Sequence, residues 1–196
     1  MTPDITEVLD LYHARREAER AAPAGQLALD DRLLAVGPET GRLINILAKS
    51  IEAPVILEIG TSYGYSGIWL AEAARAAGGR LITMEISAEK SAYAREMSAK
   101  AGLAEYVDFR VGDAVEMIGA MAERIDFVLL DLWKDLYIPC LEAFVPKLNP
   151  GAIVVADNVR PERELMAQYI DAVRAVPGMA SVTLPVGSGL EVSRYR

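Results

Sequence analysis

The chain has 196 residues, with 20 Lys and Arg against 28 Asp and Glu, and therefore a formal net charge of −8. This length corresponds to one domain, and a hydrophobic content of 52% is enough to fill a core. The acidic balance weighs against electrostatic binding of nucleic acid or an anionic membrane, because such binding rests on Lys and Arg. The single cysteine, Cys140, excludes an internal disulfide framework and a thiolate zinc cluster.

The start of the chain gives an expectation about location. Residues 1–4 lack the basic and apolar regions of a secretory signal. No stretch approaches the ~18 uncharged apolar residues that a transmembrane helix needs. Together with the single cysteine, which fits a reducing compartment, this pattern leads us to expect a cytoplasmic protein.

The first 50 residues read as helices, broken by Pro and Gly at residues 22–25 and again at 36–38. The highly charged stretch 12–20 is typical of a solvated helix face. These helices have two candidate roles, because they can cap an active site or pair with a second subunit. The sequence does not choose between the two roles.

From Pro54 onward, short β-branched runs alternate with longer helical stretches, a pattern typical of a doubly wound α/β sheet. The predicted strands are residues 55–59, 80–85, 107–111, 127–131 and 152–156, followed by a C-terminal pair at 181–184 and 190–195. The predicted helices are residues 64–77, 88–101, 114–124, 133–147 and 161–173. We therefore expect a Rossmann-like, mostly parallel, seven-stranded sheet with helices on both faces and an antiparallel hairpin at its C-terminal edge. In this single domain, residues 1–50 form a helical cap, 51–160 hold the core, and 161–196 add the last helix and edge strands.

Ligands of such sheets bind beyond the carboxyl ends of the strands, so the residues where strands stop carry the most information. The first predicted strand runs into Glu58-Ile-Gly-Thr-Ser-Tyr-Gly-Tyr-Ser66, a glycine-containing turn before a helix. Glycines allow close backbone approach to a ligand, and the helix start offers free N–H groups. Ser62 and Tyr65 stand where the dinucleotide fingerprint needs glycines, which disfavours a nicotinamide dehydrogenase.

The next two predicted strands also end in acidic residues. Glu85 is placed to accept hydrogen bonds from both hydroxyls of a ribose, as acids at this position do in nucleotide-binding folds. Asp113 has two candidate roles, because it can cap the helix that follows or contact an adenine amino group.

Asp131 closes the fourth predicted strand, and Asp157 and Asn158 close the fifth. Neighbouring strands would bring these three side chains into one small space. Two carboxylates and an amide oxygen, with no thiolate or histidine nearby, form a hard oxygen site suited to Mg²⁺. Lys134 follows Asp131 by about one helical turn.

The turn at 58–66, Glu85 and Gly112-Asp113 resemble the S-adenosylmethionine site of class I methyltransferases. Asp131-Leu-Trp-Lys-Asp135, followed by Ala156-Asp-Asn158, is similar to the catechol O-methyltransferase group of the cation-dependent O-methyltransferases, a family that also holds the caffeoyl-CoA enzymes. The similarity extends from about Val36 to Tyr195.

The resemblance implies roles for individual residues. Asp131, Asp157 and Asn158 would hold Mg²⁺ or another divalent cation, and Lys134 would be the catalytic base. The cofactor, S-adenosylmethionine, would be lined by Val36, Gly37, Glu58, Gly60, Thr61, Ser66, Glu85, Ile86, Asp113, Ala114 and Asp131. The substrate would meet Trp133, Lys134, Tyr137 and Asn158, with Leu34 and Tyr65 as further candidate walls for a flat ring. By the same analogy the protein would be a homodimer.

Two departures from the animal catechol enzymes bear on the substrate. Leu132 stands where they have histidine after the first metal aspartate, and the stretch Ala180–Thr183 offers no counterpart to their C-terminal substrate glutamate. The expected reaction is therefore methyl transfer to one hydroxyl of a catechol-like vicinal aromatic diol, with catechol itself left open as the acceptor.

Two other functions stay open from the sequence. One is methylation of a hydroxylated RNA base, against which the net charge of −8 weighs. The other is a protein that binds S-adenosylmethionine without catalysis, for which a metal site and a base would be of no use.

Overall fold

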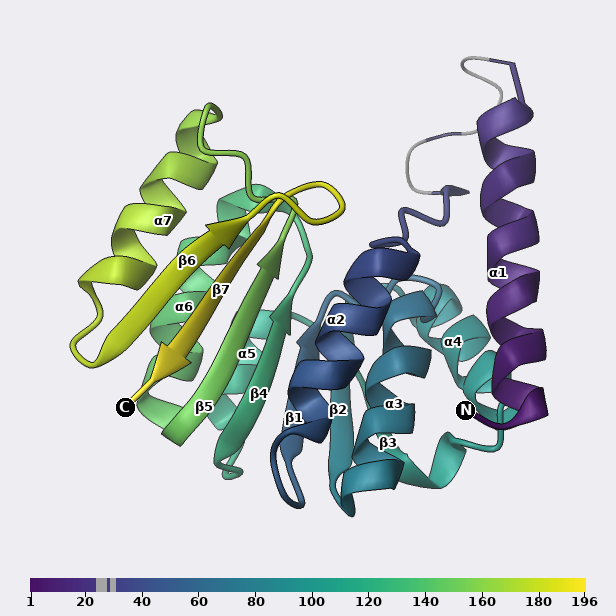
Figure 1. Ribbon diagram of the computed structural model, residues 1–196, viewed down its shortest axis with the longest axis horizontal. Helices are drawn as coiled ribbons and strands as arrows, with labels where there is room; N and C mark the ends of the chain where they lie inside the picture. Colours follow the sequence, from purple (N-terminus) through teal and green to yellow (C-terminus); the bar gives the residue numbers. More distant parts are fainter. Residues whose placement is uncertain (24–27, 29–30) are drawn as a thin grey trace.

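The computed structural model describes residues 1–23, 28 and 31–196. It contains a seven-stranded sheet with the order β3-β2-β1-β4-β5-β7-β6 (Figure 1). The strands are β1 (Val55–Ile59), β2 (Arg80–Glu85), β3 (Val107–Val111), β4 (Ile125–Leu130), β5 (Leu148–Asp157), β6 (Met179–Leu184) and β7 (Leu190–Tyr195). The first five run parallel, and β7 pairs antiparallel with both β5 and β6. The predicted fold class, including the antiparallel hairpin, is confirmed.

Helices cover both faces of this sheet (Figure 1). The α-helices are α1 (Pro3–Ala21), α2 (Pro38–Lys49), α3 (Tyr65–Ala77), α4 (Ala88–Lys100), α5 (Ala114–Ala120), α6 (Tyr137–Phe144) and α7 (Glu164–Ala175). The apolar side chains of α1 to α4 form one buried cluster, and those of α5 to α7 form a second. The two clusters lie on opposite faces of the sheet.

Alternation along the central strands fills both clusters. In β4, Phe127 and Leu129 belong to the α1–α4 cluster, whereas Val128 and Leu130 belong to the α5–α7 cluster. Successive side chains of a strand point to opposite faces, so a strand between two helical layers is apolar at most of its positions. This burial on both faces explains the continuous apolar runs in the sequence.

Several element boundaries differ from the prediction. Helix α5 ends at Ala120 instead of residue 124, and the predicted helix at 133–147 is divided into a 3-10 turn (Lys134–Leu136), α6 and a second 3-10 turn (Val145–Lys147). Pro146 has no N–H for a helix and disfavours helical geometry in the residue before it, which explains the second division. Of the predicted break at 22–25, residues 24 and 25 lie outside the described residues. Helix α1 ends at Ala21, and residues 32–37 are not helical, so the predicted break at 36–38 is only the last part of a longer non-helical stretch, and Pro38 itself begins α2.

None of the helices in the described part of the chain combines the length and the apolar character that crossing a membrane requires.

Candidate active site

The turn between β1 and α3 packs directly against the end of β4. Gly60 has a φ of +103°, and a Cβ there would lie 1.9 Å from the backbone oxygen of Asp131. Only glycine fits this contact, because a side chain would collide with the backbone of the neighbouring strand. The contact sets the turn beside the first of the predicted metal ligands.

Glu85, at the end of β2, holds the same turn from the other side. Its carboxylate accepts hydrogen bonds from the backbone N–H of Ser62 at 2.7 Å and of Ser87 at 3.0 Å. Ser62 has a φ of +47°, so the carboxylate stabilises a residue in the left-handed region. A carboxylate has about four lone-pair sites, so Glu85 retains capacity for donors of a ligand.

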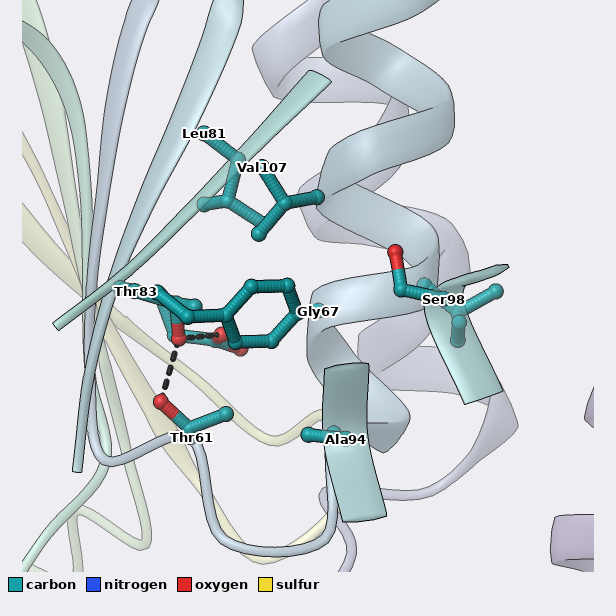
Figure 2. A pocket seen from close by; sticks show the side chains of 11 residues that line it. Thr61, Gly67, Leu81, Thr83, Ala94, Ser98 and Val107 are labelled. Carbon is teal, nitrogen blue, oxygen red and sulfur yellow. Dashed lines mark hydrogen bonds between the residues drawn. The ribbon is translucent and has the colours of Figure 1, made fainter. Parts of the chain in front are cut away.

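A chain of buried hydroxyl groups lies beneath the turn. The Thr61 hydroxyl is 2.5 Å from that of Thr83, which donates to the Glu58 carboxylate at 2.5 Å (Figure 2). Glu58 is fully buried, and burial raises its pKa from the ordinary 4.5 to about 7 despite hydrogen bonds from Ser66 and Thr83. Ser98 faces the same small cavity of about 10 Å³, which is the space of about one water molecule.

This burial predicts a pH dependence of stability. The folded state binds the Glu58 proton more tightly than the unfolded chain, so this contribution is full below pH 4.5 and is lost as the pH rises through about 7. We expect Glu58→Gln to leave the free energy of unfolding nearly unchanged at pH 4.5 and to raise it at pH 8, by on the order of 3 kcal/mol. Urea unfolding at both pH values measures the effect, with the exposed Glu52→Gln as a control. A Glu58→Gln variant no more stable than the wild type at pH 8 contradicts the prediction.

The remaining predicted cofactor residues lie along the same edge of the sheet. Asp113 caps α5, since its carboxylate accepts from the backbone N–H of Glu116 at 2.9 Å. The structure thus shows the capping role of Asp113. Ala114 begins α5, Ile86 is 69% exposed beyond β2, and Val36 and Gly37 directly precede α2.

The three predicted metal ligands come together. The amide nitrogen of Asn158 lies 3.1 Å from Oδ1 of Asp131 and 2.7 Å from Oδ2 of Asp157. Asn158 reaches both carboxylates because it follows β5 with a φ of +58°, a left-handed conformation that asparagine tolerates. The predicted convergence of the β4 and β5 ends is therefore present in the structure.

The electrostatics of this cluster favour a cation. Burial raises the pKa of Asp131, and burial together with the neighbouring Asp131 carboxylate raises the pKa of Asp157 to about 7. The Oδ1 atom of Asp157 is buried and has no hydrogen-bond partner in the structure. Two buried carboxylates destabilise each other unless positive charge lies between them.

The donor set fits a hard divalent cation. Nowhere in the described ranges do three or more His, Cys, Asp or Glu side chains gather as a metal site. The candidate set consists instead of two carboxylates and one amide, and the amide presents its oxygen after a half-turn of its side-chain torsion. Oxygen ligands in this number suit Mg²⁺, which keeps coordination positions for water or substrate.

Lys134 lies at the edge of this cluster. Its Nζ is 3.6 Å from Oδ1 of Asp131 and donates to the Tyr137 hydroxyl at 2.5 Å. The Tyr137 hydroxyl in turn donates to the backbone oxygen of Asp157 at 2.8 Å. Burial lowers the pKa of Lys134, although the carboxylates of Asp131 and Asp157 oppose the shift. An amine with a lowered pKa is more readily available as a base.

The predicted ring walls have different outcomes. Trp133 is 53% exposed, as a surface for a flat ligand has to be, and Leu34 is 49% exposed. Tyr137 is fully buried, with its ring against Tyr169 at a centroid distance of 5.2 Å, so the prediction that it is a ring wall is wrong. Tyr65 is 3% exposed beneath α1, which excludes it from the same role.

The sequence did not predict the buried hydroxyl groups that hold the site residues in place. Thr83 is a polar residue between the apolar residues Leu81-Ile82 and Met84 of β2. This interruption of the apolar run is a signal in the sequence, and the buried hydroxyl chain explains it. The link from Lys134 through Tyr137 to the end of β5 joins residues 20 apart in the chain. No local sequence pattern reports such a contact.

The comparisons with known proteins agree with this geometry. The family described as O-methyltransferase matches residues 25–190. A catechol O-methyltransferase of Mycobacterium tuberculosis is 33% identical over 174 residues, which are 87% of this chain and 78% of that protein. A catechol O-methyltransferase of Niastella koreensis is 35% identical over 130 residues, 64% of this chain, and the match spans only 58% of that relative's length.

A solved structure extends the similarity to the whole fold. The O-methyltransferase TomG of Streptomyces achromogenes, crystallised in complex with SAM, superposes with a TM-score of 0.78 at 26% identity, covering 100% of this chain and 90% of that one. The family match, the relatives and the arrangement of strand-end residues give one answer: the chain belongs to the O-methyltransferase family.

Proposed function

We propose that the protein transfers a methyl group from S-adenosylmethionine (SAM) to one hydroxyl of a vicinal aromatic diol, with the help of a divalent cation. The observation that carries this proposal is the cluster of Asp131, Asp157 and Asn158 with the Lys134 amine 3.6 Å from one of its carboxylates. Two relatives named catechol O-methyltransferase and a similar structure in complex with SAM support it.

The turn after β1 fits the proposed methyl donor. Gly60 keeps the backbone bare where the turn meets the end of β4, and Glu85 holds a carboxylate beside it. We infer that Glu85 accepts hydrogen bonds from the ribose hydroxyls and that the exposed Ile86 packs on the adenine. The sulfonium group would then lie near the Asp131 carboxylate, where negative charge favours it.

In the proposed reaction a bond forms between an aromatic oxygen and the methyl carbon while the methyl–sulfur bond breaks, with S-adenosylhomocysteine as the other product. A phenol with a pKa near 10 is a poor nucleophile at pH 7. When bound, a divalent cation would supply the Lewis acidity that favours the ionised form of the reacting hydroxyl. Asp131, Asp157 and Asn158 would hold it.

Lys134 would accept the proton of the reacting hydroxyl. Burial lowers the pKa of its amine, which increases the neutral fraction that can act as a base at neutral pH. The exposed indole of Trp133 stands beside it in the chain and offers a flat surface for the aromatic ring. Orientation of the two hydroxyls is expected to supply much of the rate, so a phenol with one hydroxyl should be a poor acceptor.

Tyr137 would act as a positioning residue for Lys134, because its hydroxyl joins the amine to the backbone of Asp157. We expect Tyr137→Phe to lower kcat by about tenfold and to leave the KM for SAM within about twofold, since one hydrogen bond to a charged group contributes about 1.5 kcal/mol. Tyr169→Phe is the matched control, because it removes a buried hydroxyl without a hydrogen-bond partner from the same ring pair. Equal kcat values for the two variants would show that Tyr137 has only a packing role.

The acceptor class is tested by supplying methyl-labelled SAM with Mg²⁺ to catechol, to phenol and to RNA in parallel. We expect label in the catechol product, at least about a hundredfold less in phenol, and none in RNA. Equal labelling of phenol would contradict chelation by two hydroxyls, and label confined to RNA would contradict the small-molecule acceptor.

A further inference from the structure

Helix α1 contacts the turn that joins β1 to α3, and it lies beside α3 and α4 (Figure 1). The side chain of Tyr12 on α1 is 1% exposed, and its hydroxyl donates to the backbone oxygen of Tyr63 at 2.5 Å. Burial raises the pKa of Tyr12 above its ordinary value, so the hydroxyl keeps its proton and stays a donor. A side chain of α1 therefore holds the backbone of a turn that follows it by 51 residues.

The turn at 60–64 depends on such support because several of its residues have a positive φ. Gly60 and Gly64 adopt these angles readily, whereas Ser62, at +47°, does so at a free-energy cost that neighbouring groups have to offset. Glu85 accepts from the N–H of Ser62, and Tyr12 donates to the oxygen of the residue that follows it. Side chains from β2 and α1 thus hold adjacent residues of the turn.

The side chain of Tyr63 is also held from outside the turn. The guanidinium carbon of Arg15, on α1, lies 4.0 Å from the centre of the Tyr63 ring, and the Tyr93 ring of α4 meets it edge-on at a centroid distance of 5.5 Å. Glu19 in turn accepts from Arg15 Nε at 2.8 Å. A cation over a ring face and an edge-on ring pair both attract. The backbone oxygen and the ring of Tyr63 therefore both depend on the docking of α1.

This turn lies where the proposed methyl donor would bind, between Glu85 and the end of β4. A ligand binds more tightly to a turn that already has the right shape, because its apparent affinity falls with the fraction of protein in the competent conformation. We propose that Tyr12 is a positioning residue for SAM, and that its hydroxyl keeps the turn at 60–64 in the conformation that binds the cofactor. The inference rests on the proposed function for the location of SAM. It gives α1 a role that differs from the two, a cap or a subunit contact, that the sequence leaves open.

Tyr12→Phe tests the proposal, because it removes the hydroxyl and keeps the buried ring. We expect calorimetric titration to show SAM binding at least about fivefold more weakly to this variant than to the wild type, with a matching rise in the KM for SAM. The kcat at saturating SAM and the KM for catechol should stay within about twofold, because the change is confined to the cofactor turn. Equal SAM affinity of the variant and the wild type overturns the inference.

Tyr65→Phe is the matched control. The Tyr65 hydroxyl lies 3.0 Å from Nε2 of His13, so this variant also removes one hydrogen bond between α1 and the start of α3, but it leaves the Tyr63 oxygen with its donor. Both variants should lower the Tm by about 2–4 °C, whereas only Tyr12→Phe should weaken SAM binding. Equal weakening by the two variants would show that SAM responds to any loosening of α1, which overturns the specific role of Tyr12.

Amide hydrogen exchange of the wild-type protein tests the same coupling without a substitution. If α1 stabilises the turn that SAM binds, the coupling is reciprocal, so saturating SAM should slow exchange in residues 3–21 as well as in 60–64. Protection confined to the turn overturns the inference. Titration and exchange use neither acceptor nor cation, so both give a result even if no diol is methylated. Absence of SAM binding to the wild type would instead overturn the proposed methyl donor, and this inference with it.

Discussion

Replacing Asp157 with alanine is expected to lower kcat/KM for a vicinal aromatic diol by about a thousandfold or more and to leave the protein folded. Asp157 is 2% exposed at the end of β5, where its carboxylate and that of Asp131 form the centre of the proposed cation site. Loss of one of two carboxylates removes most of the attraction for a divalent cation.

The Asp157→Ala substitution, which lowers activity, should not lower the thermal stability of the protein. In the absence of metal, each carboxylate disfavours ionisation of the other, and Asp157→Ala relieves that repulsion. We therefore expect the Tm of the variant in EDTA to be equal to or higher than that of the wild type. Activity assays and thermal denaturation on the same preparations measure both effects.

Asp126→Asn is a suitable control, because Asp126 is a carboxylate at the opposite end of β4. It accepts from the backbone N–H of Val55 and from Asn149, so its loss is expected to lower stability and to leave the transfer rate of the folded fraction unchanged. If Asp157→Ala retained a near-normal rate, or if both variants lost activity in proportion to their unfolding, a cation site at the strand ends would be excluded.

Substitutions of Lys134 are expected to lower kcat by about 10²–10⁴-fold without a large change in SAM affinity. Lys134→Met removes both the amine and its charge, whereas Lys134→Arg keeps the charge in a group that does not give up its proton. If Lys134 is the catalytic base, both variants should show this loss of kcat.

The Lys134→Met and Lys134→Arg variants together distinguish a role as base from a role in balancing charge. If Lys134 only balanced the Asp131 carboxylate, Lys134→Arg would retain most of the wild-type kcat, and that outcome would contradict the role of base. Equilibrium titration with SAM measures the affinity of each variant. A loss of affinity that matches the loss of rate would show that the substitution disturbs the cofactor site instead.

The sequence predicted the sheet well, because strands buried on both faces consist mostly of apolar residues. Strand β1 begins and ends as predicted at Val55 and Ile59, whereas β5 extends beyond the apolar run of residues 152–156 to Leu148. The additional residues of β5 include Asn149, Pro150 and Gly151, which no strand pattern favours. They lie in an irregularity of the pairing with β4, between the pair Leu148–Ile125 and the pair Ile153–Phe127, and no local sequence pattern predicts such an irregularity.

The candidate site was predicted to the extent that topology determines it. Parallel strands bring their carboxyl ends together, so Asp131, Asp157 and Asn158 could be placed from strand order alone. The surroundings of each side chain could not be predicted from strand order. Tyr137 was therefore predicted to line the surface for a flat ring, whereas it lies in the core.

The most direct test of the central claim is the initial rate of label transfer from methyl-labelled SAM to catechol, measured with Mg²⁺, with excess EDTA, and after Mg²⁺ is restored. We predict transfer in the first condition, loss in the second, and recovery in the third, with one labelled methyl group per product molecule. A rate that EDTA leaves unchanged would contradict the cation site, and absence of transfer in all three conditions would contradict catechol methylation.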